Sequence, residues 1–432
     1  MSVISKAEIE PLLSQHARRA SGQAISFLMQ QAVENADCIS LAAGLVDEQT
    51  LPVDLARTCL ERILESPRDG RKILQYGITP GPEELRTVIQ EWLTDLESAS
   101  AVVTGPPAAI GNIVLTTGSQ QLLNLVTQAL FDPGDICIVA APTYFVYLGV
   151  LDAVGARTIA IEADEDGMCP SKLREVLEQL KRDGELHRVR MVYAVSYYDN
   201  PTGNSISAER RPELLEVVRK FSAEHQIYIL EDAAYRELQY SGSTLPSIWS
   251  YDVDRSTVIL AQTFSKSFSP GVRVGFGVLP EKLVKPICDL KGYDDFGSAH
   301  LNQNLLCEAI RSRLYQAHVR QVREGYQMKR NAMLQAADDF FAQIDGVHWV
   351  HPDGGMYVWM TLPDSIPTGF DSPLFYASTH NQKVMYVPGE LAYPTSMAGR
   401  PRNQMRLSFG VQGVDGIREG MRRLAEAVVS VR

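Results

Sequence analysis

Short apolar segments alternate with helical segments between residues 113 and 279, and this alternation constrains the fold of the 432-residue chain more than any other feature. The strand-like segments are 113–116, 136–140, 158–161, 189–195, 227–231, 258–262 and 274–279. Helical patterns lie between most of them, for example at 208–225. Strands that alternate with helices in this way predict a mainly parallel sheet that is covered on both faces.

The rest of the sequence indicates a second, smaller domain. Its pattern is helical from residue 282 to about 344, and short strands are predicted at 356–361, 384–387 and 405–408, before a closing helix at 414–429. This order is typical of an α+β domain, and the chain is long enough for one large and one small domain. We expect an N-terminal arm with two helical stretches that belongs to the small domain (1–50), a large domain (51–310) and a small C-terminal domain (311–432).

Three polar residues each follow a predicted strand of the large domain. Asn200, Asp232 and Lys266 come after the strands at 189–195, 227–231 and 258–262. The carboxyl ends of parallel strands meet at one edge of a sheet, which is where ligands bind. The sequence therefore predicts a site that brings these three side chains together.

Lys266 lies in a segment whose chemistry suits a phosphorylated aldehyde cofactor. Hydroxyl residues flank the lysine, and Arg273 follows seven positions later. A lysine amine can form a Schiff base with an aldehyde, and hydroxyls with a forked guanidinium suit a phosphate dianion. A polar turn between two strands is the other interpretation of this segment. Arg406 lies within an apolar strand, where its charge needs a partner.

Four motifs together resemble the fold-type I pyridoxal phosphate (PLP) aminotransferases of class I/II. They are DNPTG (199–203), EDAAY (231–235), FSKSFSPGVRVG (264–275) and MRLSFG (405–410), and the resemblance extends roughly from Leu41 to Gly410. Within that class, the chain resembles the subgroup that contains the 2-aminoadipate and kynurenine aminotransferases. The resemblance implies an aspartate-aminotransferase-like fold, in which a large domain with a mostly parallel seven-stranded sheet between helices is joined to a small α+β domain. It also implies ping-pong amino transfer between an L-α-amino acid and a 2-oxo acid.

The resemblance assigns the residues that would hold the cofactor. Lys266 would form the Schiff base and then act as general base, while Asp232 would pair with the ring nitrogen and Tyr235 and Asn200 with the phenolic oxygen. Tyr144 would stack on the ring. The phosphate would be bound at a helix N-terminus after a strand, a known anion site, and by nearby side chains: Gly118, Ser119, Gln120, Thr263, Ser265 and Arg273. The family usually has serine at position 263, and threonine keeps the hydroxyl.

The resemblance also assigns substrate contacts and an assembly. Arg406 would grip the substrate α-carboxylate with its fork, and Asn200 and Gly44 would line the same pocket. Tyr76 would reach the phosphate of a neighbouring subunit. This implies a homodimer with shared active sites.

Three features depart from the subgroup. Asp199 stands where glutamine is frequent, so its carboxylate either approaches the ring and disfavours acidic substrates or points away. The segment 388–393 lacks the usual aromatic spacing near the substrate side chain. Arg18 and Arg19 lie on an arm that contacts substrate in relatives, and they either bind a distal carboxylate or belong to a solvated helix face.

Composition narrows the function further. The net charge of −11 argues against a nucleic-acid surface, and no apolar run reaches the roughly 20 residues that span a bilayer. The first residues lack the apolar core of a secretory signal, and neither the six cysteines nor the eight histidines show metal-ligand spacing. We expect a cytoplasmic enzyme of small molecules without a metal. Two rival functions are another PLP reaction on the same scaffold (elimination, cyclisation or oxidation) and the effector domain of a transcription factor.

Overall fold

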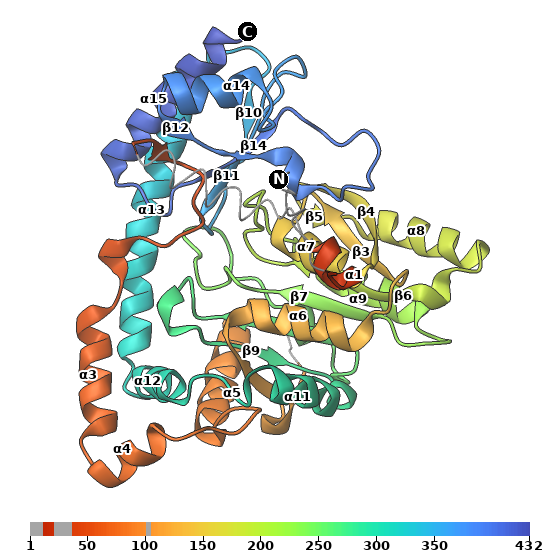
Figure 1. The fold of residues 1–432 in the computed structure, drawn as a ribbon, viewed down its shortest axis with the longest axis vertical. Helices are drawn as coiled ribbons and strands as arrows, with labels where there is room; N and C mark the ends of the chain where they lie inside the picture. The colour runs from red at the N-terminus through yellow and green to blue at the C-terminus, as the bar shows by residue number, and fades with distance from the viewer. Residues whose placement is uncertain (1–11, 21–36, 101–104) are drawn as a thin grey trace, which may run out of the picture.

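The computed structural model describes residues 12–20, 37–100 and 105–432. An eight-stranded sheet lies at its centre, with the strand order β2-β9-β8-β7-β6-β3-β4-β5 (Figure 1). The strands are β2 (Ile113–Thr116), β3 (Ile136–Ala141), β4 (Arg157–Asp164), β5 (Gly167–Met168), β6 (Val189–Val195), β7 (Tyr228–Asp232), β8 (Val258–Thr263) and β9 (Gly275–Val278). The strands from β4 to β8 in this order run parallel.

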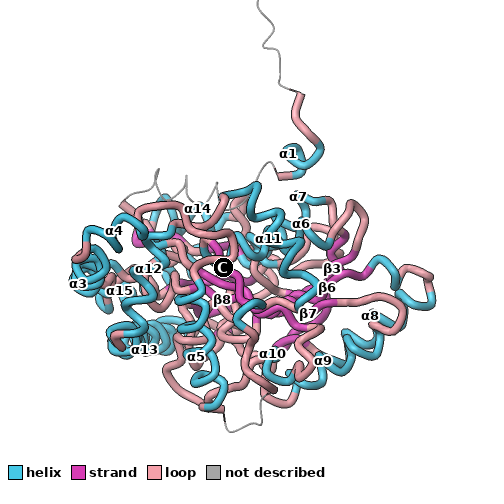
Figure 2. The backbone as a smooth tube through the Cα atoms, turned by 90° about the horizontal axis from the view of Figure 1, so that it is seen from below, coloured by secondary structure: helices cyan, strands magenta, loops and turns pink. Residues whose placement is uncertain are grey.

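Helices cover both faces of this sheet, because its strands are apolar on both sides. One face packs against α6 (Gly118–Leu130), α7 (Phe145–Val154) and α11 (Glu281–Asp295). The other packs against α5 (Glu83–Ser98), α8 (Pro170–Arg182), α9 (Arg210–Phe221) and α10 (Ile248–Tyr251). Successive side chains of a strand alternate between the two layers, as Val192 and Tyr193 of β6 do. Figure 2 shows the strands between these two groups of helices.

A smaller antiparallel sheet lies beside the large one, in the upper part of Figure 1. Its order is β10-β11-β14-β13, and its strands are β10 (His348–Trp349), β11 (Tyr357–Thr361), β14 (Gln404–Ser408) and β13 (Val387–Pro388). Strand β1 (Ile39–Ser40) pairs in parallel with β12 (Val384–Met385), so the N-terminal segment joins this part of the fold. The helices here are α14 (Pro373–Tyr376) and α15 (Val414–Ser430), which packs along α13 (Leu314–Phe341).

The remaining helices lie at the periphery. They are α1 (Gln15–Arg19), which packs on α7, and α3 (Val53–Leu64), α4 (Pro67–Ile73) and α12 (His300–Arg311), which pack together. Pro82 stands before α5, and Glu83 and Glu84 lie in its first turn, where their charges suit the helix dipole. Within the described ranges, none of the helices combines the length and apolar character needed to cross a bilayer.

The predicted fold class is confirmed, with three differences in detail. The large sheet gains an eighth strand, because β5 pairs with the end of β4 as a two-residue hairpin strand. Strand β9 runs antiparallel to both of its neighbours, β2 and β8. The strand predicted at 384–387 is divided into β12 and β13, which belong to different sheets. Of the two helical stretches predicted for the arm, the described residues contain α1, and residues 1–11 and 21–36 of the arm lie outside the described ranges.

Candidate active site

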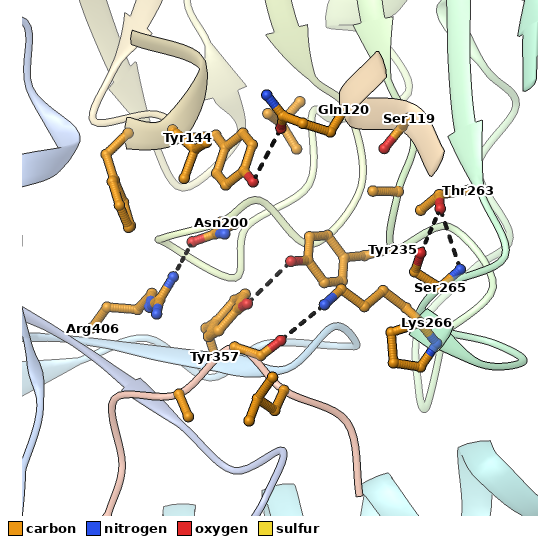
Figure 3. A pocket seen from close by; sticks show the side chains of 18 of the residues that line it. Ser119, Gln120, Tyr144, Asn200, Tyr235, Thr263, Ser265, Lys266, Tyr357 and Arg406 are labelled. Atoms are coloured by element: carbon orange, nitrogen blue, oxygen red, sulfur yellow. Dashed lines mark hydrogen bonds between the residues drawn. The ribbon is translucent and has the colours of Figure 1, made fainter. Parts of the chain in front are cut away.

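A cavity of about 300 Å³ opens at the carboxyl ends of β6, β7 and β8. Its walls come from the large sheet, from the segment after β1 and from strands β11 and β14 of the smaller sheet. Asn200, Asp232 and Lys266 all line it, as the strand-end argument predicts. Figure 3 shows the polar side chains of the cavity pointing toward its centre.

Lys266 is the amine of the cavity, and it lies just beyond the end of β8. Its Nζ donates a hydrogen bond of 2.9 Å to the carbonyl oxygen of Gly44. Burial lowers the pKa of Lys266, the cationic Arg406 and Arg273 lower it further, and Tyr357 partly opposes them. A buried lysine with a lowered pKa has a larger neutral fraction, and the neutral amine is the nucleophilic form.

Asp232 is a buried carboxylate at the end of β7. Its Oδ2 accepts a hydrogen bond of 3.0 Å from the hydroxyl of Tyr193, and its Oδ1 accepts one of 3.1 Å from the backbone N–H of Ala234. Burial raises the pKa of Asp232 to about 6, although these hydrogen bonds favour the charged form. In the described part of the chain it has no cationic partner within salt-bridge distance. Such a carboxylate suits a ligand that brings a positive charge.

Hydroxyls and a guanidinium gather at one end of the cavity. The Oγ1 of Thr263 donates to the Oγ of Ser265 at 2.9 Å, and Nη1 of Arg273 donates to the same Oγ at 3.4 Å. Ser119 lines the cavity in the first turn of α6. Gly118 has a φ of +72°, and a Cβ there would lie 2.6 Å from Nη2 of Arg273, so glycine is required. This donor set is the chemistry that binds a phosphate.

Arg406 crosses the opposite end of the cavity from β14. Its Nη1 donates to Oδ1 of Asn200 at 2.8 Å, and its Nη2 donates to the carbonyl of Ala42 at 2.7 Å. Its Nε has no hydrogen-bond partner among the described residues, although the side chain is buried. A buried guanidinium with an unsatisfied donor fits a carboxylate that arrives with the substrate.

Aromatic side chains complete the walls. The hydroxyls of Tyr235 and Tyr357 are 3.1 Å apart, and the hydroxyl of Tyr144 lies 3.5 Å from Oε1 of Gln120 (Figure 3). The ring of Tyr357 lies 4.3 Å from the Arg406 guanidinium carbon. Tyr144 immediately precedes α7. These rings reduce the access of water to the charged groups.

The cavity collects most of the residues that the sequence predicts for the site. Its lining includes Gly44, Ser119, Gln120, Tyr144, Asn200, Asp232, Tyr235, Thr263, Ser265, Lys266, Arg273 and Arg406. Gly118 lies behind Arg273. Tyr76 does not line the cavity of its own chain, because its side chain is 85% exposed beside Phe296.

The structure also shows where the residues that differ from the subgroup, or that lie on the N-terminal arm, are located. Asp199 lines a separate cavity of about 240 Å³, so of the two alternatives for its carboxylate the structure has the one that points away. Glu390 binds Arg402 at 3.0 Å, and Arg19 lines a surface groove beside α7. None of these three side chains lines the main cavity.

Two tyrosines of the site escape prediction from the sequence. Tyr193 lies inside the apolar strand β6 and Tyr357 inside the apolar strand β11, where the sequence pattern predicts a residue of the hydrophobic core. Their hydroxyls become visible as site groups only when their strands are placed beside Asp232 and Lys266.

Comparisons with known proteins agree with this geometry. The family "Aminotransferase class I and II" matches residues 36–413. Aromatic-amino-acid aminotransferase 1 of Thermococcus litoralis is 33% identical, over 92% of this chain and 89% of its own. The Pyrococcus horikoshii kynurenine aminotransferase, solved in complex with PMP, KYN and KYA, superposes with a TM-score of 0.87 at 33% identity and covers 98% of both chains. The α-aminoadipate aminotransferase LysN of Thermus thermophilus, complexed with N-(5'-phosphopyridoxyl)-L-leucine, has a TM-score of 0.82 at 29% identity and covers 97% of both chains.

Proposed function

This chain belongs to the class I and II aminotransferase family, and we propose that it works with PLP bound in the cavity around Lys266. It is an enzyme that moves an amino group between an amino acid and a 2-oxo acid. The observation that carries the cofactor proposal is the buried Asp232, which meets no cation in the described chain and shares its cavity with a buried lysine. A protonated pyridine nitrogen supplies the missing charge, and an aldehyde is the natural partner of the lysine amine.

The residues present fit the parts of PLP. Asp232 would hold the ring nitrogen, and Tyr235 and Asn200 the phenolic oxygen. The phosphate would meet the donors at the other end of the cavity, which are Gly118, Ser119, Gln120, Thr263, Ser265 and Arg273. Tyr144 would cover one face of the ring. When bound, PLP supplies an electron sink for the electron pair that remains at the substrate Cα after a proton leaves.

The side chains of the cavity then perform three tasks. Arg406 holds the α-carboxylate through its fork and its free Nε, which fixes the direction of the Cα–H bond. The Lys266 amine, whose burial favours its neutral form, removes the Cα proton as general base. The aromatic walls exclude water, which strengthens the electrostatic contacts inside.

The end of the cavity near Arg406 favours a large apolar or aromatic substrate side chain. Ala42 and Phe145 contact Arg406 there, and Met385 packs in one apolar cluster with them; Leu45 and Val146 also line the cavity. The cationic residues among the described lining are Lys266, Arg273 and Arg406, and each already has a task. A second substrate carboxylate would therefore meet apolar surface. One relative carries the name aromatic-amino-acid aminotransferase, which agrees with this substrate class.

A homodimer with shared sites is supported by an exposed apolar surface. Leu74, Tyr76, Ile78, Tyr293 and Phe296 are all more than half exposed. The rings of Tyr76 and Phe296 are 6.5 Å apart, and the carbonyl of Phe296 accepts a hydrogen bond from Thr79. Exposed large apolar side chains of this kind are typical of a subunit interface. Tyr76 would reach the phosphate of the partner subunit.

The domain division and the location in the cell complete the proposal. The arm (1–50) belongs with the small domain (311–432), which the β1–β12 pairing supports, and the large domain comprises 51–310. The cysteines are Cys38, Cys59, Cys137, Cys169, Cys288 and Cys307, and all six are free thiols. Free thiols agree with a cytoplasmic enzyme.

The test is a half-reaction with a stoichiometric amount of protein. We expect the PLP-loaded enzyme to release one 2-oxo acid per site from phenylalanine or tyrosine with no acceptor present. A different 2-oxo acid, added afterwards, should yield one new amino acid per site. Release of ammonia instead would support elimination or oxidation. Reduction with borohydride should attach the cofactor's mass to the peptide that contains Lys266, and attachment elsewhere would contradict the role of this residue.

A further inference from the structure

Tyr357 contacts several functional groups of the cavity, but the proposed function assigns it no role. Its hydroxyl lies 3.1 Å from that of Tyr235, and its ring lies 4.3 Å from the guanidinium carbon of Arg406. The rings of Tyr357 and Tyr235 meet edge to face, with centroids 5.7 Å apart. The side chain comes from β11 of the smaller sheet and is buried.

The Tyr357 hydroxyl and the Lys266 amine both lie against Gly44. The Lys266 Nζ donates to the carbonyl oxygen of Gly44, and a Cβ on Gly44 would lie 2.9 Å from the Tyr357 hydroxyl oxygen. Among the described residues other than the chain neighbours of Gly44, that oxygen is the one atom within 4 Å of the added Cβ. The Tyr357 phenol therefore occupies the space above the Cα of Gly44, whose carbonyl accepts the hydrogen bond from the Lys266 amine. Figure 3 shows the Tyr357 and Lys266 side chains both pointing into the cavity.

We propose that Tyr357 is a positioning residue in which the hydroxyl is the proton partner of the Lys266 amine and the ring fixes the Arg406 guanidinium. The inference rests on the role proposed for Lys266. When an N–H bond of the Lys266 ammonium breaks, the proton passes to the Tyr357 phenolate oxygen and forms its O–H bond. The reverse transfer restores the pair. The total charge of the two groups is unchanged, so the lysine becomes neutral without releasing a proton to solvent.

The charges around the hydroxyl support this exchange. The titratable and charged groups that face it are Arg406 from β14, Lys266 beyond β8, Tyr235 beyond β7, Tyr144 before α7 and Tyr326 from α13. They are two cations and three phenols. Burial opposes ionisation of Tyr357, but Arg406, Lys266 and the hydrogen bond from Tyr235 outweigh it and lower the pKa of Tyr357. An ionised Tyr357 in turn raises the pKa of Lys266.

Tyr357→Phe tests the hydroxyl while keeping the ring over Arg406. The matched control is Tyr197→Phe, since Tyr197 is also buried and donates one hydrogen bond, to the carbonyl of Leu245, but lies outside the cavity. The first readout is the near-ultraviolet absorbance of phenolate during a pH titration of the full chain without PLP. We expect the Tyr357 variant to lose one tyrosine that ionises below the usual value of about 10. An unchanged titration would overturn the proposal.

The second readout is the rate at which the PLP-free chain captures added PLP, measured against pH. Without the phenolate, the described charged groups that act on the pKa of Lys266 are the cations Arg406 and Arg273, so the neutral form of Lys266 should extend to lower pH. We expect the midpoint of the capture profile to move to lower pH in Tyr357→Phe and to stay in place in Tyr197→Phe. A midpoint that does not move in Tyr357→Phe contradicts the proton exchange. A wild-type chain that captures no PLP would instead contradict the proposed function, so the two failures are distinguishable.

Discussion

The hydroxyl of Tyr193 donates a hydrogen bond of 3.0 Å to Asp232 from the neighbouring strand, so the carboxylate is held from within the sheet. A donor of this kind favours the ionised carboxylate. We expect Tyr193→Phe to weaken PLP binding by about ten- to a hundredfold, since a hydrogen bond to a charged group contributes roughly 1.5–3 kcal/mol. Equilibrium dialysis of PLP at pH 7 measures the change. Tyr197→Phe is the control, and equal affinities for the two variants would contradict this role of Tyr193.

Asp232→Asn should raise the free energy of unfolding of the PLP-free chain and lower its affinity for PLP. The pKa of Asp232 is raised from 3.8 to about 6, so the folded chain binds this proton more tightly than the unfolded chain does. The contribution of this group to stability is present at low pH and is lost as the pH rises from about 4 through about 6. At about 1.4 kcal/mol per pKa unit, the PLP-free variant should gain up to roughly 3 kcal/mol over the wild type at pH 7.

Chemical denaturation of the two PLP-free chains at pH 4 and pH 7 measures this difference in the free energy of unfolding. A difference that does not grow with pH would show that burial does not penalise the carboxylate. In the same variant, PLP affinity should fall and lose its dependence on pH near 6, because the charge proposed to pair with the ring nitrogen is absent.

Arg406→Lys should damage the recognition of α-amino acids selectively. The variant keeps the charge but loses the fork and the free Nε, at a cost of about 3 kcal/mol, so kcat/KM should fall roughly a hundredfold. Amines without a carboxylate should react with the variant and the wild type at similar rates. Arg402→Lys, which alters an exposed pair with Glu390, should leave kcat/KM unchanged. A fall of equal size for simple amines would count against carboxylate binding by Arg406.

Subunit mixing tests whether Tyr76 serves the partner subunit. Lys266→Ala and Tyr76→Ala chains should each be poorly active alone. If Tyr76 serves the partner, then in a mixed dimer one site combines an intact Lys266 with an intact Tyr76 from the other chain. We expect activity to reappear after the two chains are unfolded and refolded together, up to about half of the mixed dimers' sites. If Tyr76 serves its own subunit, no mixed site is intact and no activity returns.

Gly44→Ala should be harmful because of Tyr357. The added Cβ would lie 2.9 Å from the tyrosine hydroxyl, whereas a Cβ added at Gly111 meets no atom of the other described residues within 4 Å. We expect Gly44→Ala to lower the thermal unfolding midpoint, and Gly111→Ala to change it little. The effect of Gly44→Ala should shrink in a Tyr357→Phe background, where the clashing oxygen is gone. If the effects of Gly44→Ala and Tyr357→Phe on the unfolding midpoint simply add, the destabilisation by Gly44→Ala does not come from contact with the Tyr357 hydroxyl.

The large sheet could be predicted from the sequence because its strands are apolar runs of useful length separated by helices. The gathering of Asn200, Asp232 and Lys266 followed from the rule for strand ends alone. The two-residue strands β1, β5 and β13 carry too few residues for any periodicity, and their pairing is decided by tertiary contacts. The antiparallel direction of β9 could not be predicted from the sequence either, because an apolar strand of this kind suits a parallel or an antiparallel neighbour.

The site residues that could not be predicted from the sequence are those whose role depends on the direction in which the side chain points. Tyr193 and Tyr357 look like core residues in apolar strands, and only the placement of two sheets turns their hydroxyls toward Asp232 and Lys266. Asp199 is the converse case. It adjoins Asn200 in sequence, but the turn that hydrogen-bonds Asp199 to Asn204 directs its carboxylate into the separate cavity. Burial there raises the pKa of Asp199 well above its ordinary value.

The pairing of β1 with β12 has a consequence for how the chain is synthesised. The segment after β1 supplies Ala42 and Gly44 to the cavity, yet its partner strand leaves the ribosome only after the whole large sheet. Arg406 is translated later still. The groups suited to a phosphate and a ring nitrogen can therefore assemble on the nascent chain while the carboxylate grip is still missing. The donors proposed for the cofactor are therefore translated before Arg406, the group proposed to bind the substrate carboxylate.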